Sequence, residues 1–292
     1  MVGCPAGKLL KGKKMQKILK EFGLNTDNSV YVIAEIGLNH GGDIDVAKKL
    51  IDSAAKTGVD AVKFQTYITE KRVPKDSPIF GILKQCELPF DAFKELKNYS
   101  ENYGIEFFST PFDEESVDYL ENIDCNIYKI ASFDVVNNTL LKKIASTKKA
   151  VIMSVGMSNI DEINHAYDIL KTATKKISLL HCISAYPTSE MDANLAAIFS
   201  LKQNYDCVIG QSDHTNDIIV PLYAVAAGAQ VVEKHFKIDD AMNCVDAPVS
   251  ITELQLKKLV SEIRRIESIF GNGQLGITNA QKGTVVFRRY KQ

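Results

Sequence analysis

The sequence has no tryptophan, no excess of charge of either sign and no long hydrophobic run. Its 35 basic and 36 acidic residues leave a net charge of −1, so no global field attracts nucleic acid or anionic lipid. The most apolar stretch, from Val220 to Val232, is too short to span a bilayer. The first 14 residues carry four lysines and lack the apolar run of a signal peptide. These absences predict a cytoplasmic protein that binds neither nucleic acid nor membrane.

Closely spaced cysteines are also missing. The six cysteines are scattered without a CxxC pair, which excludes a zinc knuckle and argues against a disulfide framework in a chain of 292 residues. A composition that is 45% hydrophobic and 24% charged is typical of a globular protein with a large core.

Short apolar runs alternate with amphipathic helical stretches along most of the chain. Eight runs are strand-like: Val30–Gly37, Val59–Tyr67, Ile105–Phe112, Ile127–Ser132, Ala150–Val155, Ile177–Ile183, Cys207–Ser212 and Gln230–Phe236. Helical stretches follow them, from Asp45–Thr57 to Thr252–Phe270, and no GxGxxG or GxxxxGK follows the first strand. Eight such units predict an α/β protein with a (β/α)8 TIM barrel at residues 30–270. Residues 1–29 are then a basic leader that plugs the barrel, and residues 271–292 are a tail.

Polar side chains gather at the ends of the predicted strands, where barrel enzymes place their catalytic groups. Lys63 and Lys129, together with several hydroxyls, are suited to a small anion with several charges. His214 and His235 lie on adjacent strands and suggest a divalent ion, for which imidazole favours manganese over magnesium. Glu35 and Asp134 add carboxylates for proton transfer.

Each of these residues also has a purely structural interpretation. A buried lysine often pairs with a glutamate, here Glu35 or Glu233, and a single histidine is usually a packing residue. Phe112 and Tyr186 are equally compatible with ordinary packing. The clustering of these residues at the strand ends, rather than any one of them, indicates a site.

The same residues carry a family resemblance. The stretches Glu35-Ile36-Gly37-Leu38-Asn39-His40, Ser212-Asp213-His214-Thr215 and Glu233-Lys234-His235-Phe236 occur in that order. Together with the segments around Lys63 and Lys129, they resemble the sialic acid synthase family from about Val30 to Gly273. The resemblance implies a transferase that joins phosphoenolpyruvate to an acetamido sugar, such as N-acetylmannosamine, and releases phosphate. It also implies a homodimer and a divalent metal, Mn²⁺ in preference to Mg²⁺ or Co²⁺.

The resemblance assigns roles by position. Catalytic roles fall on Glu35, Asp134, Lys63 and Lys129, and metal binding falls on His214 and His235. The phosphoenolpyruvate cradle comprises Lys63, Thr110, Lys129, Ser132, Ser154, Ser184 and Ser212. The sugar is expected to contact Gln65, Phe112, Tyr186 and Asp246.

Four departures from the family pattern bear on the choice of sugar. Asp134 stands where the family often has Glu, and Ser184 replaces a common Asn. Cys244 and Val245 replace the usual Gly-Pro before Asp246. The small antifreeze-like domain with which family members usually continue is absent from this sequence. Diacetamido-trideoxyhexoses are therefore candidates beside N-acetylmannosamine.

Two alternative functions are compatible with a barrel of this kind. One is a synthase that condenses phosphoenolpyruvate with a phosphorylated aldose, which would need a second basic cluster. Arg72 is the single arginine before Arg264, which argues against that cluster. The other is a sugar-binding descendant without catalysis, which has no reason to keep a costly set of buried charges.

Overall fold

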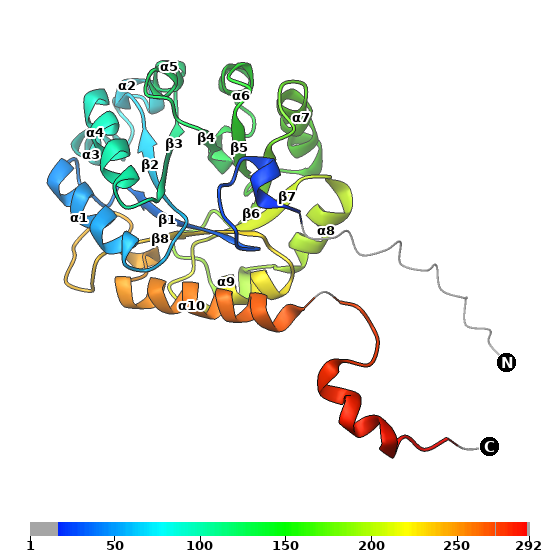
Figure 1. Cartoon of the computed structure of the whole chain (residues 1–292). Coiled ribbons are helices and arrows are strands. Elements are labelled where there is room, and N and C mark those ends of the chain that lie inside the picture. Colours follow the sequence, from blue (N-terminus) through cyan, green and yellow to red (C-terminus); the bar gives the residue numbers. More distant parts are fainter. Residues whose placement is uncertain (1–16, 272, 291–292) are drawn as a thin grey trace.

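Eight parallel strands hydrogen-bond to one another in sequence order, and β1 pairs with β8 to close a barrel. The computed structural model describes residues 17–271 and 273–290 (Figure 1). The strands are β1 (Tyr31–Gly37), β2 (Ala61–Thr66), β3 (Glu106–Pro111), β4 (Ile127–Ile130), β5 (Ala150–Ser154), β6 (Ile177–Cys182), β7 (Val208–Asp213) and β8 (Val231–His235). The prediction of a (β/α)8 barrel is confirmed.

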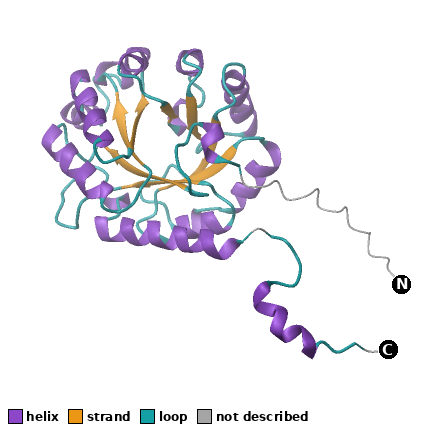
Figure 2. Ribbon diagram, viewed as in Figure 1, coloured by secondary structure: helices purple, strands orange, loops and turns teal. Residues whose placement is uncertain are grey.

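Helices cover the outside of the strands, as Figure 2 shows. They are α1 (Ile44–Ala55), α2 (Thr69–Arg72), α3 (Phe80–Cys86), α4 (Phe90–Glu101), α5 (Glu114–Asn122), α6 (Asn138–Ser146), α7 (Ile160–Lys171), α8 (Ala196–Asn204), α9 (Ile219–Ala226) and α10 (Glu253–Phe270). Short 3-10 turns add η1 (Leu19–Phe22), η2 (Ser132–Asp134), η3 (Glu190–Asp192), η4 (Ala247–Val249) and η5 (Asn279–Phe287). None of the helices among the described residues is long and apolar enough to cross a membrane.

Side-chain caps explain where several helices begin. The Asp43 carboxylate accepts hydrogen bonds from two backbone N–H groups in the first turn of α1. Asn159 with Glu162, and Thr252 with Gln255, form reciprocal capping boxes at the starts of α7 and α10. These caps satisfy N–H groups in the first turn of each helix that would otherwise be unpaired.

The interior of the barrel has an apolar layer and a polar layer, because successive residues of a strand point to opposite faces. Tyr31, Ile33 and Val231 pack together in the lower layer with inward residues of the other strands. Two residues further along the same faces, Glu35 and Glu233 line a cavity. The chemistry is thus confined to the carboxyl ends of the strands, above an apolar floor.

Residues 17–29 lie at the amino end of the barrel. Leu19 and Leu24 join the cluster of the lower layer, next to Tyr31 and Ala150. Gly23 has φ 80°, and a side chain there would meet the Ala150 Cβ at 2.7 Å, so this turn requires glycine. The part of the predicted leader at residues 1–16 lies outside the described residues.

The eight strands begin and end within two residues of their predicted bounds. The difference lies between β2 and α4, where the short helices α2 and α3 were not predicted. The predicted tail contains η5, which carries no buried residue.

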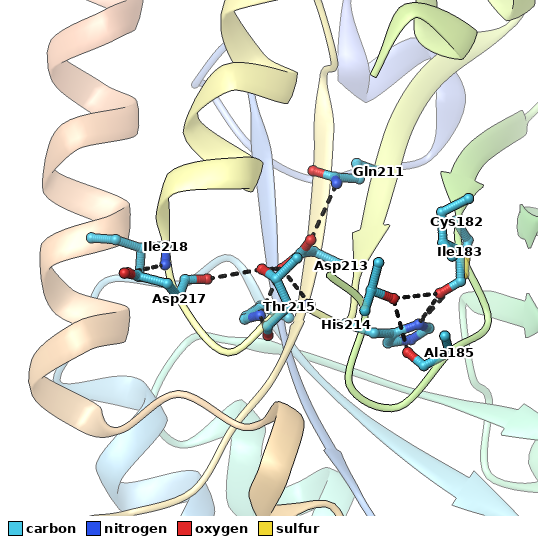
Figure 3. A network of polar contacts seen from close by, with 11 residues as sticks. Cys182, Ile183, Ala185, Gln211, Asp213, His214, Thr215, Asp217 and Ile218 are labelled. Carbon is cyan, nitrogen blue, oxygen red and sulfur yellow. Dashed lines mark hydrogen bonds and ion pairs between the residues drawn. The ribbon is translucent and has the colours of Figure 1, made fainter. Parts of the chain in front are cut away.

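A buried ion pair joins β7 to β8 on the face opposite the cavity. The Lys234 ammonium lies 2.6 Å from an Asp213 carboxylate oxygen, and both side chains are almost fully buried. Lys234 also donates to the carbonyl of Thr215. Figure 3 shows Asp213 in contact with Gln211 and Thr215 at the start of the β7–α9 loop, the segment that also carries His214.

Replacing Asp213 by Ala should destabilise the protein by about 3–5 kcal/mol, because the buried Lys234 ammonium loses its counter-ion. Urea unfolding of wild type and variant measures this difference. Asp27→Ala is the matched control, because Asp27 pairs with Lys20 at the surface and the two side chains are 93% and 50% exposed. Loss of this ion pair should lower the stability by less than about 1 kcal/mol. Equal effects of the two substitutions would contradict the role of the buried pair.

Candidate active site

A cavity of about 340 Å³ opens at the carboxyl ends of the strands, and each of the eight strands or the loop that follows it contributes to its wall. Its polar lining consists of Glu35, Lys63, Gln65, Arg72, Thr110, Lys129, Ser132, Ser154, Ser184, Tyr186, Ser212, His214, Glu233, His235 and Asp246. Every residue that the sequence analysis assigned to the site lies in this wall except Asp134.

Two buried lysines share one carboxylate at the centre of the cavity. The Glu233 Oε1 atom lies 3.0 Å from the Lys129 Nζ and 3.6 Å from the Lys63 Nζ. It also accepts a hydrogen bond of 3.0 Å from the Ser212 hydroxyl. Lys63 completes its contacts with a Glu35 carboxylate oxygen at 2.8 Å and the Thr110 hydroxyl at 3.1 Å. These charges come from β1, β2, β4 and β8, so only the closed barrel brings them together.

The ionisation of this cluster follows from burial and from the neighbouring charges. Burial alone would raise the pKa of Glu233, but the charges of Lys129 and Lys63 outweigh it and hold that pKa at about 2. Burial raises the pKa of Glu35, although Lys63 acts against it. Burial, assisted by the charge of Lys63, lowers the pKa of Lys129. An anion bound beside Lys129 would act against this lowering, because it favours the charged form of the lysine.

Hydroxyl groups surround the same space. The Ser154 hydroxyl is buried and has no hydrogen-bond partner among the described residues, which is unusual unless a ligand or water occupies the site. The hydroxyls of Ser132 and Ser184 converge on Gly156, whose backbone N–H donates to the Ser132 Oγ at 3.0 Å. A Cβ on Gly156 would lie 2.6 Å from the Ser184 Oγ and 2.9 Å from the Ser132 Oγ, so glycine keeps these hydroxyls accessible.

A second group of polar side chains meets at Gly37, the last residue of β1. A Cβ there would lie 3.0 Å from the Glu35 Oε1, and 3.3 Å from both an Asp246 carboxylate oxygen and the Gln65 amide nitrogen. Gln65 donates to Glu35 at 3.2 Å. Glu35 thus links this group to the lysine cluster. Asp246, which precedes η4, reaches it from the loop after β8.

The two predicted metal ligands are neighbours. The rings of His214 and His235 have centroids 5.4 Å apart, and Tyr186 packs against His214 at 4.1 Å. Figure 3 shows the His214 ring directed at the carbonyl of Ile183, and the Nδ1–O distance is 2.7 Å. Burial and the nearby His235 lower the pKa of His214 to about 3, so the ring is neutral at pH 7 and its Nδ1 donates to that carbonyl. The Nε2 atom keeps its lone pair.

Nitrogen and oxygen donors are both present at this position. The His235 Nδ1 lies 3.3 Å from an Asp246 carboxylate oxygen. Within the described parts of the chain, no three His, Cys, Asp or Glu side chains are already arranged around a common metal position. Two imidazoles with a carboxylate beside them nevertheless form a donor set that suits a divalent ion such as manganese. The residues present therefore fit a metal in type.

Asp134 is placed differently from the other predicted residues. It ends the 3-10 turn η2, and its neighbours Ser132 and Phe133 line the cavity while its own side chain does not. The tight turn directs the Asp134 carboxylate toward Asn137, which donates to it at 3.1 Å. Burial raises the pKa of Asp134.

Sequence reasoning did not include Arg72 and Glu233 in the site. Glu233 had been considered as an ion-pair partner for a buried lysine, and the structure shows it paired with two. Arg72 ends α2 and lines the cavity, with its guanidinium carbon 3.6 Å from the centre of the Phe112 ring. The one feature of the sequence that sets Arg72 apart is that no other arginine precedes Arg264.

The sequence matches the NeuB family over residues 50–275. It is 45% identical over 245 residues to an uncharacterized protein of Methanocaldococcus jannaschii, covering 84% of this chain and 73% of that one. It is 41% identical over 259 residues to the N,N'-diacetyllegionaminic acid synthase of Campylobacter jejuni, covering 83% and 78% of the two chains.

A solved structure agrees with these relatives. The N-acetylneuraminic acid (sialic acid) synthetase of Leptospira borgpetersenii, determined in complex with citrate, superposes with a TM-score of 0.86 and 41% identity. The superposition covers 89% of this chain and 91% of that one. The resemblance found in the sequence is thereby confirmed: the chain belongs to the NeuB family and is related to synthases of legionaminic and sialic acids.

Proposed function

We propose that this protein condenses phosphoenolpyruvate with the open-chain aldehyde of an N-acetylated amino sugar. Carbon 3 of phosphoenolpyruvate attacks the aldehyde carbon, water adds at carbon 2, and phosphate leaves as a nine-carbon 2-keto acid forms. The observation that carries the proposal is the pair of buried lysines that share Glu233 beneath a ring of hydroxyls. The named activities of the relatives support it.

Phosphoenolpyruvate would bind at the lysine cluster. Lys63 and Lys129 place two buried side-chain amines beside the Glu233 carboxylate, at 3.6 Å and 3.0 Å from its Oε1 atom. The carboxylate and the phosphate of the ligand would pair with these two lysines. The hydroxyls of Thr110, Ser132, Ser154, Ser184 and Ser212 would supply the remaining hydrogen bonds to their oxygens.

Glu35 is placed to move a proton at the acceptor. Its carboxyl group lies between Lys63 and Gln65, which connects the anion site to the wall where the sugar is proposed to bind. In its protonated form it would donate to the aldehyde oxygen as the new carbon–carbon bond forms, and it would return to that form by taking a proton from water. Gln65, Phe112, Tyr186 and Asp246 would hold the sugar above it.

His214 and His235, with Asp246 beside them, would hold a divalent ion, Mn²⁺ in preference to Mg²⁺ or Co²⁺. Such an ion supplies Lewis-acid polarisation of the aldehyde oxygen. The protein's own part is to keep both rings oriented, through the hydrogen bond from His214 to Ile183 and the contact between His235 and Asp246. A homodimer and a cytoplasmic location stay predictions from the sequence.

The direct test is phosphate release from phosphoenolpyruvate in the presence of Mn²⁺, with a panel of acetamido-hexoses that includes N-acetylmannosamine and diacetamido-trideoxyhexoses. We expect release that depends on one of these sugars, with a nine-carbon keto acid of matching mass. Release with phosphorylated aldoses alone would instead support the alternative synthase. Binding of phosphoenolpyruvate without product from any aldehyde would support a non-catalytic descendant.

Lys129→Met should raise the KM for phosphoenolpyruvate by about 100-fold or more, because the buried anion site loses one of its two ammonium groups. Lys63 remains to pair with Glu233, so the variant is expected to fold. Steady-state phosphate release measures the effect, and Lys142→Met, on an exposed position of α6, is the matched control. An unchanged KM would remove Lys129 from the anion site.

His214→Ala and His235→Ala should each abolish the stimulation of activity by Mn²⁺, because each removes an imidazole donor. Metal titration of phosphate release, together with metal content after dialysis, measures this loss, and circular dichroism checks the fold. His165→Ala is the control, since that ring lies on the exposed face of α7 and contacts Asn138. Full activation by Mn²⁺ in either variant would disprove the metal site.

A further inference from the structure

Arg72 is the single arginine among the residues that line the cavity, and it lies apart from the lysine cluster. Its Nη1 donates to the Gln65 amide oxygen at 2.9 Å, and Gln65 in turn donates to Glu35. Gln65 and Glu35 therefore separate its guanidinium from Lys63 in the chain of hydrogen bonds. Binding of an anion at Lys63 and Lys129 therefore does not explain why Arg72 is present in the cavity wall.

Aromatic packing holds the Arg72 guanidinium in place. Its central carbon lies 3.6 Å from the centre of the Phe112 ring and 4.7 Å from that of Tyr67. These two rings meet edge to face. A guanidinium clamped between aromatic rings presents its N–H edge in a fixed direction, unlike a flexible lysine. The bond to Gln65 is the hydrogen bond that the described residues provide to it, so further N–H groups are available to a ligand.

The charge around Arg72 indicates what kind of ligand suits it. Burial lowers the pKa of Arg72, and the carboxylates of Asp134, Asp246 and Glu35 act in the opposite direction because they lie close to it. A further phosphate or carboxylate would be repelled by these acids. A neutral carbonyl oxygen accepts a hydrogen bond from the guanidinium without adding charge.

The wall next to Arg72 is apolar. Phe112 and Leu38 line the cavity and belong to one apolar cluster with Tyr67, the second ring against Arg72. An oxygen acceptor with a methyl group beside it would satisfy both the guanidinium and this wall. An acetamido group has that chemistry, whereas a hydroxyl lacks the methyl group and a phosphate adds charge.

We propose that Arg72 is a specificity-determining residue that donates a hydrogen bond to the carbonyl oxygen of an acetamido substituent on the acceptor sugar, with the methyl group of that substituent against Phe112 and Leu38. The inference rests on the proposed condensation and names the residue that selects its acceptor. It gives α2, which was not predicted from the sequence, a function in the site.

The test compares the full-length wild type with Arg72→Met and Arg72→Lys in the phosphate-release assay. With the acetamido acceptor that the wild type uses, Arg72→Met should raise the acceptor KM by about 10- to 100-fold, because a hydrogen bond to a charged donor is lost. The KM for phosphoenolpyruvate should change less than about twofold. The acceptor KM of Arg72→Lys should lie between those of the wild type and Arg72→Met, since lysine keeps the charge but not the planar guanidinium. Arg72→Lys is the test variant if Arg72→Met does not fold.

Lys71→Met is the matched control. Lys71 occupies the preceding position of α2, is partly exposed and pairs with Glu115, so its loss removes the same charge from the same short helix outside the cavity. Both KM values of this variant should stay at the wild-type level. A second readout is kcat/KM for N-acetylmannosamine divided by kcat/KM for mannose. This ratio should fall in Arg72→Met by the same factor by which the acceptor KM rises.

The outcomes separate this inference from the function on which it rests. A wild-type protein that forms no keto acid with any acceptor contradicts both. A wild-type protein that forms it, while Arg72→Met keeps the acceptor KM, contradicts the assignment of Arg72 alone. An equal rise in both KM values, or a rise in Lys71→Met as well, would show a structural role for this segment and would also overturn the proposal.

Discussion

Burying two ammonium groups next to one carboxylate is the constraint on which the rest of the site depends. Glu233, Lys63 and Lys129 belong to three strands that are far apart in the sequence, and they meet only if the barrel closes in the observed register. A shift of one residue in any of these strands would turn the charged side chain toward the helices and leave the others without a partner. The register is therefore tied to the electrostatics of the cavity.

The two layers of the barrel interior divide stability from chemistry. The apolar lower layer, with Ile33 and Val231, is packed like any protein core. The layer above it holds the charges and the unpaired Ser154 hydroxyl. The loops add a third level, in which α2 brings Arg72 and the segment before η4 brings Asp246.

The sequence predicted the parts of this arrangement that periodicity and strand position determine. Glu35, Lys63 and His235 were placed in the site because they follow apolar runs at the strand ends, where parallel barrels collect their functional groups. Asp134 does not line the cavity, because the 3-10 turn after β4 brings its carboxylate into contact with Asn137, although its charge still acts on Arg72. No pattern of alternation describes a tight turn of this kind.

Arg72 was not predicted as a site residue for a related reason. α2 is a single turn of four residues, too short to show a hydrophobic period, and no helix was predicted in the connection where it lies. Its position depends on packing against Phe112 and Tyr67, which are brought to it by β3 and by the end of β2. Contacts of this kind exist only in the folded chain.

The apolar layer also determines how ligands reach the cavity. Leu19, Leu24 and the lower layer fill the barrel below it, so ligands enter and leave at the carboxyl ends of the strands. Lys63 and Lys129 are 3% exposed, whereas Tyr186 is 47% exposed at the wall. If the proposed small anion binds between the lysines, it has to enter before any larger molecule that covers it. Steady-state kinetics with two such ligands would then follow a compulsory order, in which the deeper one binds first.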